Sequence, residues 1–343
     1  MTNLVQICKD VERRVALVDE PRLRCLAGVP SVYELAQRCI SAGLGLREQA
    51  ARLATGESLD YDAVYSGASA WRLLTPIDVP GEPSRLIVSG TGLTHLGSAR
   101  DRDAMHASGE EETAGETEDA SMTDSMRIFK WGLKGGRPAP QEIGTAPEWF
   151  YKGNGTVLRA PFEPLTVPAF GEDGGEEAEI AGVYIIGPDG TPWRAGMATG
   201  NEFSDHQFEK QNYLYLAGSK LRACSIGPEL AAGTDFVSVT GRVSIQRGAQ
   251  TVWSKEIATG ETNMCHSLAN LEHHHFKYPG HRRPGDVHVH YYGAHSLSYG
   301  DGVVLEEGDV MEVCFEGFGR ALRNPIHMEC KQDHRLVSVR SLA

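Results

Sequence analysis

The chain has 343 residues and a formal net charge of −13 at neutral pH. This charge disfavours binding to nucleic acid or an anionic membrane, because both expose phosphate groups that clustered basic side chains must neutralise. No apolar run approaches the ~18 residues that a membrane-spanning helix needs. The composition therefore predicts a globular protein with neither partner. The length predicts two unequal domains, since single cores rarely grow beyond roughly 250 to 300 residues.

The beginning of the sequence, MTNLVQICKDVERRVALVDE, lacks the basic segment and apolar core of a secretory signal, so we expect a cytoplasmic protein. The seven cysteines are scattered and form no C-x-x-C pair. This distribution is evidence against a disulfide framework or a structural zinc site. We expect reduced thiols.

Residues 1–80 predict a small α/β domain. Apolar runs at residues 4–7 and 15–18 are typical of strands, and SVYELAQRCISAGLGLREQAARLA has a helical period. Ser31 and Glu34 form a capping-box pattern at its start. The following segment, LLTPIDVPGEPSRLIVSG, holds three prolines before a new strand. We place the domain boundary there and expect the second domain over residues 85–343.

Residues 108–124, SGEEETAGETEDASMTD, contain seven acidic residues and no basic one. Such a segment buries too little apolar surface to offset its ordering entropy, which predicts a mobile loop. The loop is either a solvated insertion or a lid over an active site. His106 precedes it and would enter the site if the lid closed.

The sequence becomes β-rich from about residue 145, with short β-branched and aromatic runs between Gly, Pro and Asp turns. This pattern predicts a mixed, β-rich α+β fold with a curled sheet or a barrel-like sandwich. The predicted strands cover residues 156–158, 165–167, 178–186, 236–245, 251–257, 287–292 and 310–315.

The stretch EEAEIAGVYIIG concentrates negative charge at the start of a predicted strand. The two-residue period of a strand places Glu177 and Glu179 on one face, whereas Glu176 points the other way. Two carboxylates on one face repel each other unless a cation lies between them. Asp205, in a later polar turn, offers a third hard oxygen ligand, and such a set suits octahedral Mg²⁺ or Mn²⁺.

Several further features follow these residues in a fixed order. They are Lys220, the Gly227-Pro228 pair, a Gly285-Asp286 turn and the segment LEEGDVMEVCFEGFGRALRNP. From about residue 85 to 326 this order resembles the fumarylacetoacetate hydrolase superfamily. The stretch IVSGTGLTHLGSARDRDAMH is similar to the branch of that superfamily found in sugar-acid catabolism.

The resemblance implies a curled β-roll with a small N-terminal domain, assembled as a homodimer. It also implies a divalent metal that chelates the carboxylate and keto oxygen of a small 2-oxo acid. The implied ligands are Glu177, Glu179 and Asp205, with Lys220 as the family lysine, and the metal is Mg²⁺, with Mn²⁺ or Ca²⁺ as alternatives. The implied substrate contacts are Gly92, Leu93, Thr94, Lys152, Gly293, Ala294, His295 and Ser296, of which Lys152 is alternatively structural.

The sequence departs from the family pattern at several positions. Ser204 precedes Asp205 where relatives have Asn, and Gly293-Ala294-His295 replaces a G-T-P turn. These changes favour dehydration of a 2-keto-3-deoxy sugar acid over carbon–carbon hydrolysis. The expected substrate is a 2-keto-3-deoxypentonate such as 2-keto-3-deoxyarabinonate, and the product is 2-oxoglutarate semialdehyde. Hydrolysis of an acylpyruvate or 2,4-diketo acid, and binding of a 2-oxo acid without turnover, remain alternatives.

The residues that would move protons are open at this stage. His95 follows the glycine-rich turn GTGLTH and is either a proton-transfer residue or a hydrogen-bonded structural histidine. Lys220 either positions substrate oxygens or acts as acid and base, if burial lowers its pKa. His288 and His290 alternate along a predicted strand, which permits a two-ligand zinc interpretation beside a structural one.

Overall fold

The computed structural model of the chain describes residues 2–107 and 122–342, and nothing is described for the side chains of residues 105–107. Within this part of the chain no helix combines the length and apolar character needed to cross a bilayer. The acidic segment predicted as a loop lies almost wholly outside the described residues.

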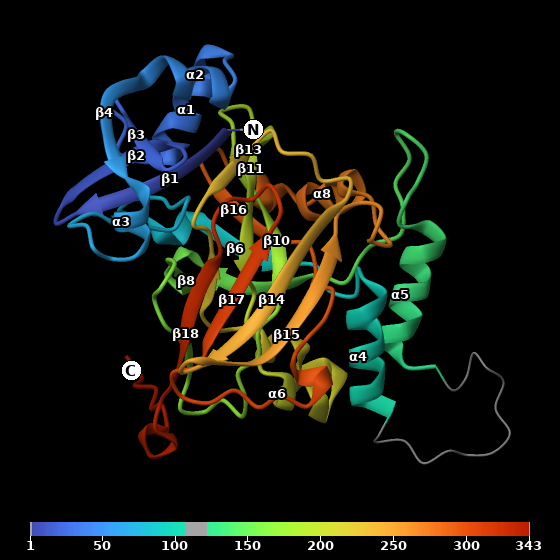
Figure 1. Cartoon of the computed structure of the whole chain (residues 1–343). Coiled ribbons are helices and arrows are strands. Elements are labelled where there is room, and N and C mark those ends of the chain that lie inside the picture. Colours follow the sequence, from blue (N-terminus) through green and yellow to red (C-terminus); the bar gives the residue numbers. More distant parts are fainter. Residues whose placement is uncertain (1, 108–121, 343) are drawn as a thin grey trace, which may run out of the picture.

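The N-terminal segment folds as an antiparallel ribbon of strands with short helices (Figure 1). Ser31 accepts a hydrogen bond from the Glu34 N–H at 3.1 Å, as its capping position predicts. Gly43, with φ of 66°, ends the first helix, so the single predicted helix is two. The elements are β1 Thr2–Lys9, β2 Glu12–Asp19, β3 Arg22–Leu26, α1 Val32–Ala42, α2 Leu46–Leu53, β4 Ala54–Asp60, α3 Tyr61–Tyr65 and β5 Arg72–Leu73.

These strands continue into one large mixed sheet with the order β4-β3-β2-β1-β13-β11-β10-β16-β6-β7. β1 pairs antiparallel with β13, so the sheet runs unbroken across the predicted domain boundary. The division into two domains stays a prediction. The further strands of this sheet are β6 Leu86–Gly90, β7 Phe150–Asn154, β8 Leu158–Arg159, β10 Ala178–Ile186, β11 Pro192–Asn201, β12 Cys224–Ile226, β13 Leu230–Ala232 and β16 Val287–Tyr291.

A second sheet, of order β15-β14-β17-β18-β9, packs against the large one (Figure 1). Its strands are β9 Leu165–Val167, β14 Val239–Arg247, β15 Gln250–Thr259, β17 Val310–Phe315 and β18 Leu322–Met328. The predicted strand at 156–158 is largely wrong, because residues 155–157 form a 3₁₀ turn. The prediction of a β-rich α+β fold is confirmed.

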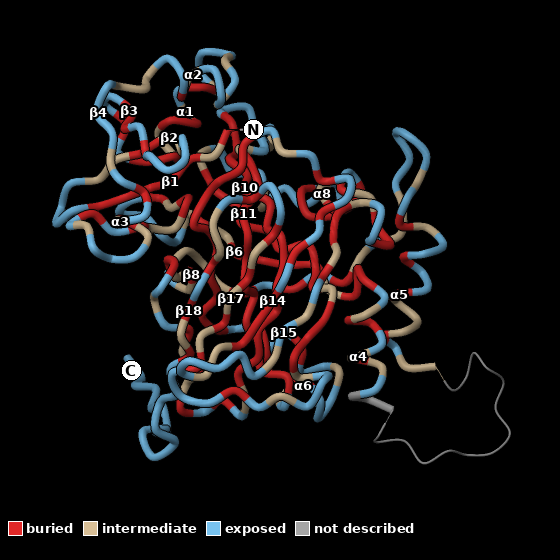
Figure 2. The backbone as a smooth tube through the Cα atoms, in the orientation of Figure 1, coloured by how far each residue is buried: buried red, intermediate tan, exposed pale blue. Residues whose placement is uncertain are grey.

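Two cores lie on opposite faces of the large sheet. On one face α1 packs onto Val183 and Ile185 of β10. On the other face Ile180 packs against Val243 and Val313 of the second sheet. Figure 2 shows the buried backbone running through the centre of both sheets. Each fully buried aliphatic side chain contributes on the order of 1.5–3 kcal/mol, so these cores fix β10 firmly.

The remaining helices surround the sheets. α4 and α5 pack together at one side of the molecule (Figure 1), and α8 contacts the start of β16 through His275 and His288. The helices are α4 Leu96–Ala107, α5 Asp124–Gly135, α6 His206–Gln211, α7 Leu216–Ser219 and α8 Leu268–Phe276. The 3₁₀ turns are Pro83–Arg85, Gly155–Val157, Tyr213–Tyr215, Pro279–Arg282, Tyr299–Asp301 and Lys331–Asp333.

Candidate metal centre

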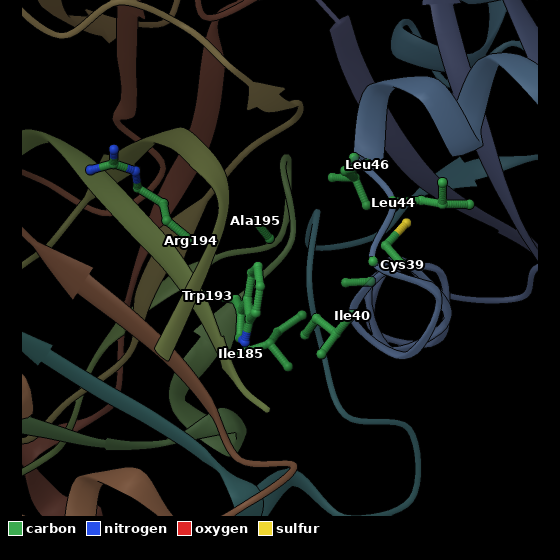
Figure 3. Close-up of a pocket in the computed structure, with 11 residues that line it drawn as sticks. Cys39, Ile40, Leu44, Leu46, Ile185, Trp193, Arg194 and Ala195 are labelled. Atoms are coloured by element: carbon green, nitrogen blue, oxygen red, sulfur yellow. The ribbon is translucent and has the colours of Figure 1, made fainter. Parts of the chain in front are cut away.

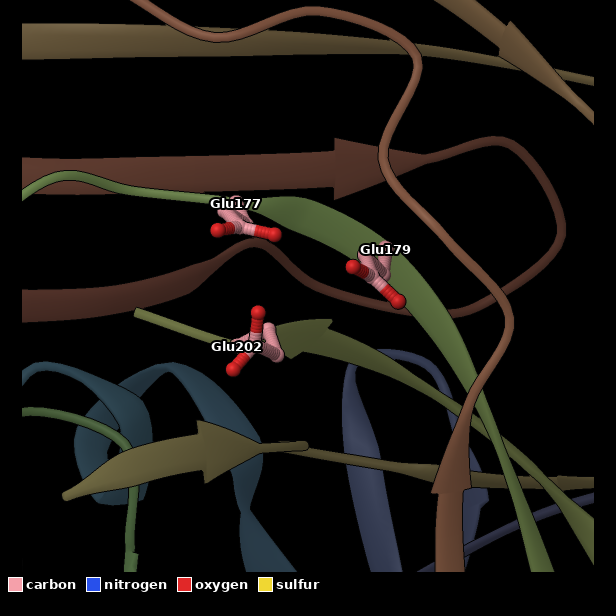
Figure 4. Close-up of side chains that lie close together, drawn as sticks. All are labelled: Glu177, Glu179 and Glu202. Atoms are coloured by element: carbon pink, nitrogen blue, oxygen red, sulfur yellow. The ribbon is translucent and has the colours of Figure 1, made fainter. Parts of the chain in front are cut away.

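Three buried glutamates converge where β10 begins and β11 ends. Glu177, Glu179 and Glu202 each offer one carboxylate oxygen, and these oxygens lie within 4.8 Å of one another (Figure 4). Within the described part of the chain this is the only group of three His, Cys, Asp or Glu side chains close enough to hold a metal ion. The structure thus joins two of the predicted ligands and adds a third.

The register of the β10–β11 pair explains why Glu202 belongs to the cluster. The two strands are antiparallel, with Ala178 opposite Asn201 and Glu179 opposite Gly200. One step beyond, the Glu202 N–H donates to the Glu177 carbonyl at 2.9 Å. Directly opposed residues of an antiparallel pair project their side chains to the same face. The pairing therefore brings Glu202 to the two glutamates of β10.

Asp205 does not join the cluster, which corrects the predicted ligand set. Its Oδ2 accepts hydrogen bonds from Arg222 Nη2 at 2.6 Å and from the Glu172 N–H at 2.9 Å. Its Oδ1 accepts from the Phe208 N–H at 3.0 Å and caps α6. Both carboxylate oxygens are thus bound to groups other than the three glutamates.

The missed ligand had a sequence signal. Asn201-Glu202, directly at the end of β11, matches the Asn-Asp pair of the family pattern with a carboxylate one methylene longer. With Asn201 rather than Ser204 at the position of that Asn, the carboxylate that follows is Glu202 and not Asp205. The corrected candidate ligands are Glu177, Glu179 and Glu202.

Lys220 binds the glutamates with its whole ammonium group. Its Nζ lies 2.6 Å from Glu177 Oε1, 2.6 Å from Glu202 Oε2 and 2.8 Å from the hydroxyl of Ser204. A lysine ammonium has three donors, and these partners use all of them. Burial opposes its charge, but the two carboxylates outweigh this effect and raise the pKa of Lys220. These contacts favour the alternative in which Lys220 is a positioning residue.

Lys152, predicted as a substrate contact, also holds a cluster glutamate. It is fully buried, and its Nζ binds Glu202 Oε1 and donates to the Phe203 carbonyl at 3.0 Å. The structural alternative for Lys152 is therefore favoured. Lys152 thus binds Oε1 of Glu202 and Lys220 binds Oε2, so the two lysines together hold this carboxylate in place.

The electrostatics of the cluster suit a cation. Burial opposes the charge of Glu177, but Lys220 and His206 outweigh it and hold its pKa well below the ordinary value. Burial and repulsion from Glu202 and Glu177 raise the pKa of Glu179 well above the ordinary value. Repulsion among the three carboxylates contributes, beside burial, to the raised pKa of Glu179, and a divalent cation among the oxygens would relieve that repulsion. Carboxylate oxygens are the donors that Mg²⁺ and Mn²⁺ prefer.

The predicted turn at Gly293 contacts the cluster through its backbone. The Gly293 N–H donates to Glu179 Oε2 at 2.7 Å. Gly293 has φ of 101°, and a Cβ there would lie 2.0 Å from Thr94 Oγ1, so only glycine fits. At the other end of the loop, the N–H and hydroxyl of Ser298 donate to Glu176 at 2.7 and 2.5 Å. Glu176, which is predicted to point away from Glu177 and Glu179, anchors the loop that carries Ala294, His295 and Ser296.

His95 lies behind the same turn and is fully hydrogen-bonded. Its Nδ1 is 2.8 Å from Thr94 Oγ1, and its Nε2 is 3.0 Å from Thr259 Oγ1. The Thr94 hydroxyl donates to the Tyr292 carbonyl at 2.7 Å, so it accepts the proton of His95 Nδ1. Burial, with a smaller effect from His295, lowers the pKa of His95 to about 3. The geometry favours the structural alternative for His95.

A buried ion network that the sequence did not predict lies against the predicted Gly92–Leu93–Thr94 subsite. Arg102 of α4 pairs with Glu148 at 2.8 Å and with Glu209 at 2.7 Å. A Cβ on Gly92 would lie 1.7 Å from Glu148 Oε2, so the backbone of Gly92 packs directly on this network. Leu93 adopts φ of 54° in the turn. His106, later on α4, lies outside the described side chains.

The histidine-rich run forms a hydrogen-bond network. Trp149 Nε1 donates to His275 Nδ1 at 3.1 Å, so His275 Nε2 carries the proton that it donates to His288 Nδ1 at 2.9 Å. Both nitrogens of His290 bind hydroxyl groups at the end of β6. Metal binding at His288 Nε2 would require the opposite tautomer, which conflicts with the proton donated by His275. The structural interpretation is favoured over zinc.

An apolar pocket of about 350 Å³ lies elsewhere, between the α1–α2 turn and the β10–β11 pair (Figure 3). Its lining includes Ile40, Leu46, Ile185 and Trp193. None of Glu177, Glu179 and Glu202 lines this pocket, so it is separate from the candidate metal centre.

No protein-family model matches the sequence, and no curated protein is similar to it. The fold, however, is shared with solved enzymes. A structure titled as 2-keto-3-deoxy-D-arabinonate dehydratase complexed with magnesium and 2,5-dioxopentanoate is similar to the chain with a TM-score of 0.68 and 16% identity, over 95% of this chain and 99% of that one.

Two isomerases have the same fold. They are 5-carboxymethyl-2-hydroxymuconate delta-isomerase from Mycobacterium smegmatis (TM-score 0.56, 17% identity, 96% of this chain and 100% of that one) and 2-hydroxyhepta-2,4-diene-1,7-dioate isomerase from Mycobacterium marinum (0.57, 16%, 96% and 99%). These likenesses confirm the predicted fold class, a β-rich roll of the fumarylacetoacetate hydrolase type, across nearly the whole chain.

Proposed function

We propose that the protein belongs to the fumarylacetoacetate hydrolase superfamily and is a Mg²⁺-dependent dehydratase of a 2-keto-3-deoxy sugar acid. The proposed substrate is a 2-keto-3-deoxypentonate such as 2-keto-3-deoxyarabinonate, and the product is 2,5-dioxopentanoate, which is 2-oxoglutarate semialdehyde. The observation that carries the proposal is the buried cluster of Glu177, Glu179 and Glu202. It lies in a fold shared with a dehydratase solved with magnesium and that product.

The similarity in fold to the dehydratase supports the proposal. Coverage is nearly equal for the dehydratase and for the two isomerases, yet the TM-score is 0.68 for the former and 0.56 and 0.57 for the latter. The replacement of a G-T-P turn by Gly293-Ala294-His295 also supports dehydration.

The cluster fits a 2-oxo acid chemically. A bound divalent cation supplies a Lewis acid that draws electron density from the C1 carboxylate and C2 oxygen and so makes the C3 protons more acidic. Glu177, Glu179 and Glu202 are the residues that would hold it. Lys220 and Lys152 keep two of these carboxylates in place, and the Gly293 N–H orients the third. A C3 proton and the C4 hydroxyl leave as water, and a proton shift from C5 then gives the semialdehyde.

We assign the proton transfer to His295 rather than His95. His95 uses both ring nitrogens, whereas His295 Nδ1 has no hydrogen-bond partner among the described residues. Burial, with a smaller contribution from Lys255, lowers the pKa of His295, so its ring is neutral near pH 7 and can accept a proton. The loop that carries it is tied to Glu179 and Glu176.

Mass spectrometry of the products tests this proposal. The purified protein is incubated with Mg²⁺ and a panel of 2-keto-3-deoxypentonates, 2-keto-3-deoxyhexonates and acylpyruvates. Dehydration yields one product that is lighter by one water, and His295→Gln lowers its rate of formation far more than His95→Gln. Two shorter products identify a hydrolase, an unchanged mass with a new retention time identifies an isomerase, and binding without any product identifies a sensor. Each of these three outcomes contradicts the dehydratase.

A further inference from the structure

We propose that α6 is a positioning element of the metal centre, in which Asp205 begins the helix and His206 fixes the orientation of Glu177. The inference rests on the proposed metal centre and extends it to a residue that does not touch the metal. His206 Nε2 lies 3.0 Å from Glu177 Oε1, and both side chains are buried. Asp205 thereby gains a role after losing the predicted one as a ligand.

The two donors on Glu177 decide which of its oxygens faces the cation. His206 Nε2 and Lys220 Nζ both bind Oε1, at 3.0 and 2.6 Å. A carboxylate oxygen has two lone pairs, so these donors use the capacity of Oε1 and leave Oε2 for the cation. Partners behind a ligand that fix its orientation typically change metal affinity by about 10- to 100-fold when they are removed.

The imidazole of His206 fits closely into its surroundings. A Cβ on Gly175 would lie 2.2 Å from His206 Nδ1, so only glycine leaves space for the ring. The ring centroid of Tyr299 lies 5.1 Å away. One ring nitrogen thus faces backbone and the other faces Glu177. Nδ1 is buried and has no hydrogen-bond partner among the described residues, whereas Nε2 is bound to Glu177. His206 therefore acts on the centre through this carboxylate, as a positioning residue.

Asp205 holds the helix that carries His206. Its carboxylate accepts the Phe208 N–H as the N-cap and is bound from the other side by Arg222 and by the Glu172 N–H. His206 is the first residue of α6, so the cap sets the position from which its ring reaches Glu177. A chain of contacts therefore leads from Arg222 through Asp205 and His206 to the metal ligand.

Metal affinity measured without substrate tests the inference. Mn²⁺ binding is followed by electron paramagnetic resonance and Mg²⁺ binding by calorimetry, for wild type, His206→Gln and His206→Asn. Gln carries its amide nitrogen near the position of Nε2 and can still donate to Glu177, whereas the amide of Asn stays near Nδ1 and cannot reach it. We expect the dissociation constant to rise about 10- to 100-fold in His206→Asn and to stay within about threefold in His206→Gln.

The matched control is His327→Asn, because His327 is half-exposed and pairs only with Glu307 in the described structure. It should bind metal as wild type does. Unchanged affinity in His206→Asn, or an equal loss in His206→Gln, overturns the inference. If His206→Asn does not fold, the single variant Gly175→Ala takes its place in the comparison with His206→Gln. The added methyl displaces the His206 ring without removing it, so Gly175→Ala should weaken metal binding and His206→Gln should not.

The readout separates this inference from the proposed function. If the wild type binds Mn²⁺ and the His206 variants differ as expected, while no 2-keto-3-deoxy acid is turned over, the positioning role stands and the dehydratase is refuted. If the wild type binds neither metal, the centre itself fails and both fall.

Discussion

Glu177 and Glu202 face each other across the β10–β11 pair, joined by a hydrogen bond of 2.9 Å between the Glu202 N–H and the Glu177 carbonyl. The candidate metal centre is therefore a product of strand register. A slip of one residue would turn a strand's side chains to the opposite face and separate the carboxylates. The cores on both faces of β10 prevent such a slip.

The first prediction concerns Glu202. Glu202→Gln keeps the side-chain volume and removes one of the three charges that attract the cation, so we expect the Mg²⁺ dissociation constant to rise at least about tenfold. Calorimetry measures it. Glu307→Gln, at an exposed position, is the control and should bind normally. Wild-type affinity in Glu202→Gln would exclude this residue as a ligand.

The second prediction separates Asp205 from the ligands. Asn still caps a helix, but Asp205→Asn leaves Arg222 buried without its carboxylate partner. We expect the free energy of unfolding, measured in urea, to fall by about 3–5 kcal/mol. The cause is that the remaining charge of the pair stays buried without a counter-charge. Mg²⁺ affinity should fall less than in Glu202→Gln. The reverse ranking, with unchanged stability, would restore Asp205 as a ligand.

The third prediction concerns Lys220. Lys220→Met leaves Glu177 and Glu202 with one buried cation fewer, so the metal-free protein should lose several kcal/mol of stability, on the order of 3–5. A bound divalent cation offsets the same repulsion. Mg²⁺ should therefore raise the melting temperature of Lys220→Met more than that of the wild type, as measured by calorimetry with and without the ion. An equal shift in both proteins would speak against a cation at this cluster.

The fourth prediction is a loss of stability in mild acid. Burial, the largest cause in each case, lowers the pKa of His95, His288 and His290 to about 3 in the folded protein. The unfolded chain has the ordinary histidine pKa of about 6.5 and takes up protons first as the pH falls. The contribution of these histidines to stability is therefore constant above about pH 6.5 and falls below it, by about 1.4 kcal/mol per pH unit for each fully titrating histidine.

Urea unfolding between about pH 5 and 7.5 measures that slope. His290→Gln removes one titrating ring while its amide can still bind the neighbouring hydroxyl groups, so the slope should decrease by about one proton. His327→Gln, with an exposed ring, should leave the slope unchanged. An identical slope in wild type and His290→Gln would mean that His290 is not held neutral by burial.

Some of the strands near the centre were predictable from the sequence, whereas β11, which leads to Glu202, is not among the predicted strands. β10 and β17 match the predicted residues 178–186 and 310–315, because each is a β-branched run bounded by glycine or acidic turns. The position of Glu177 and Glu179 on one strand face also follows from local periodicity. Such features depend on neighbours along the chain, which a sequence displays directly.

The rest of the centre depends on pairing across the fold. Glu202 joins the cluster only through the β10–β11 register, and Arg102 reaches Glu148 from a helix that is 46 residues earlier in the chain. The sequence leaves a substrate contact open for Lys220, whereas in the fold all three donors of its ammonium group are bound within the protein. A regular hairpin centred on the Pro188-Asp189-Gly190 turn places residue 202 opposite 176, and the register shift between Val183 and Tyr184 moves it opposite 177. Because this bulge is not evident from the sequence, local periodicity alone could not place Glu202.

The location of a bound cation tests the central claim most directly. Crystals grown with Mn²⁺ give an anomalous signal at the ion. The account predicts one peak bonded to carboxylate oxygens of Glu177, Glu179 and Glu202, with Asp205 still paired to Arg222. A peak at Asp205, or none at the three glutamates, would contradict it.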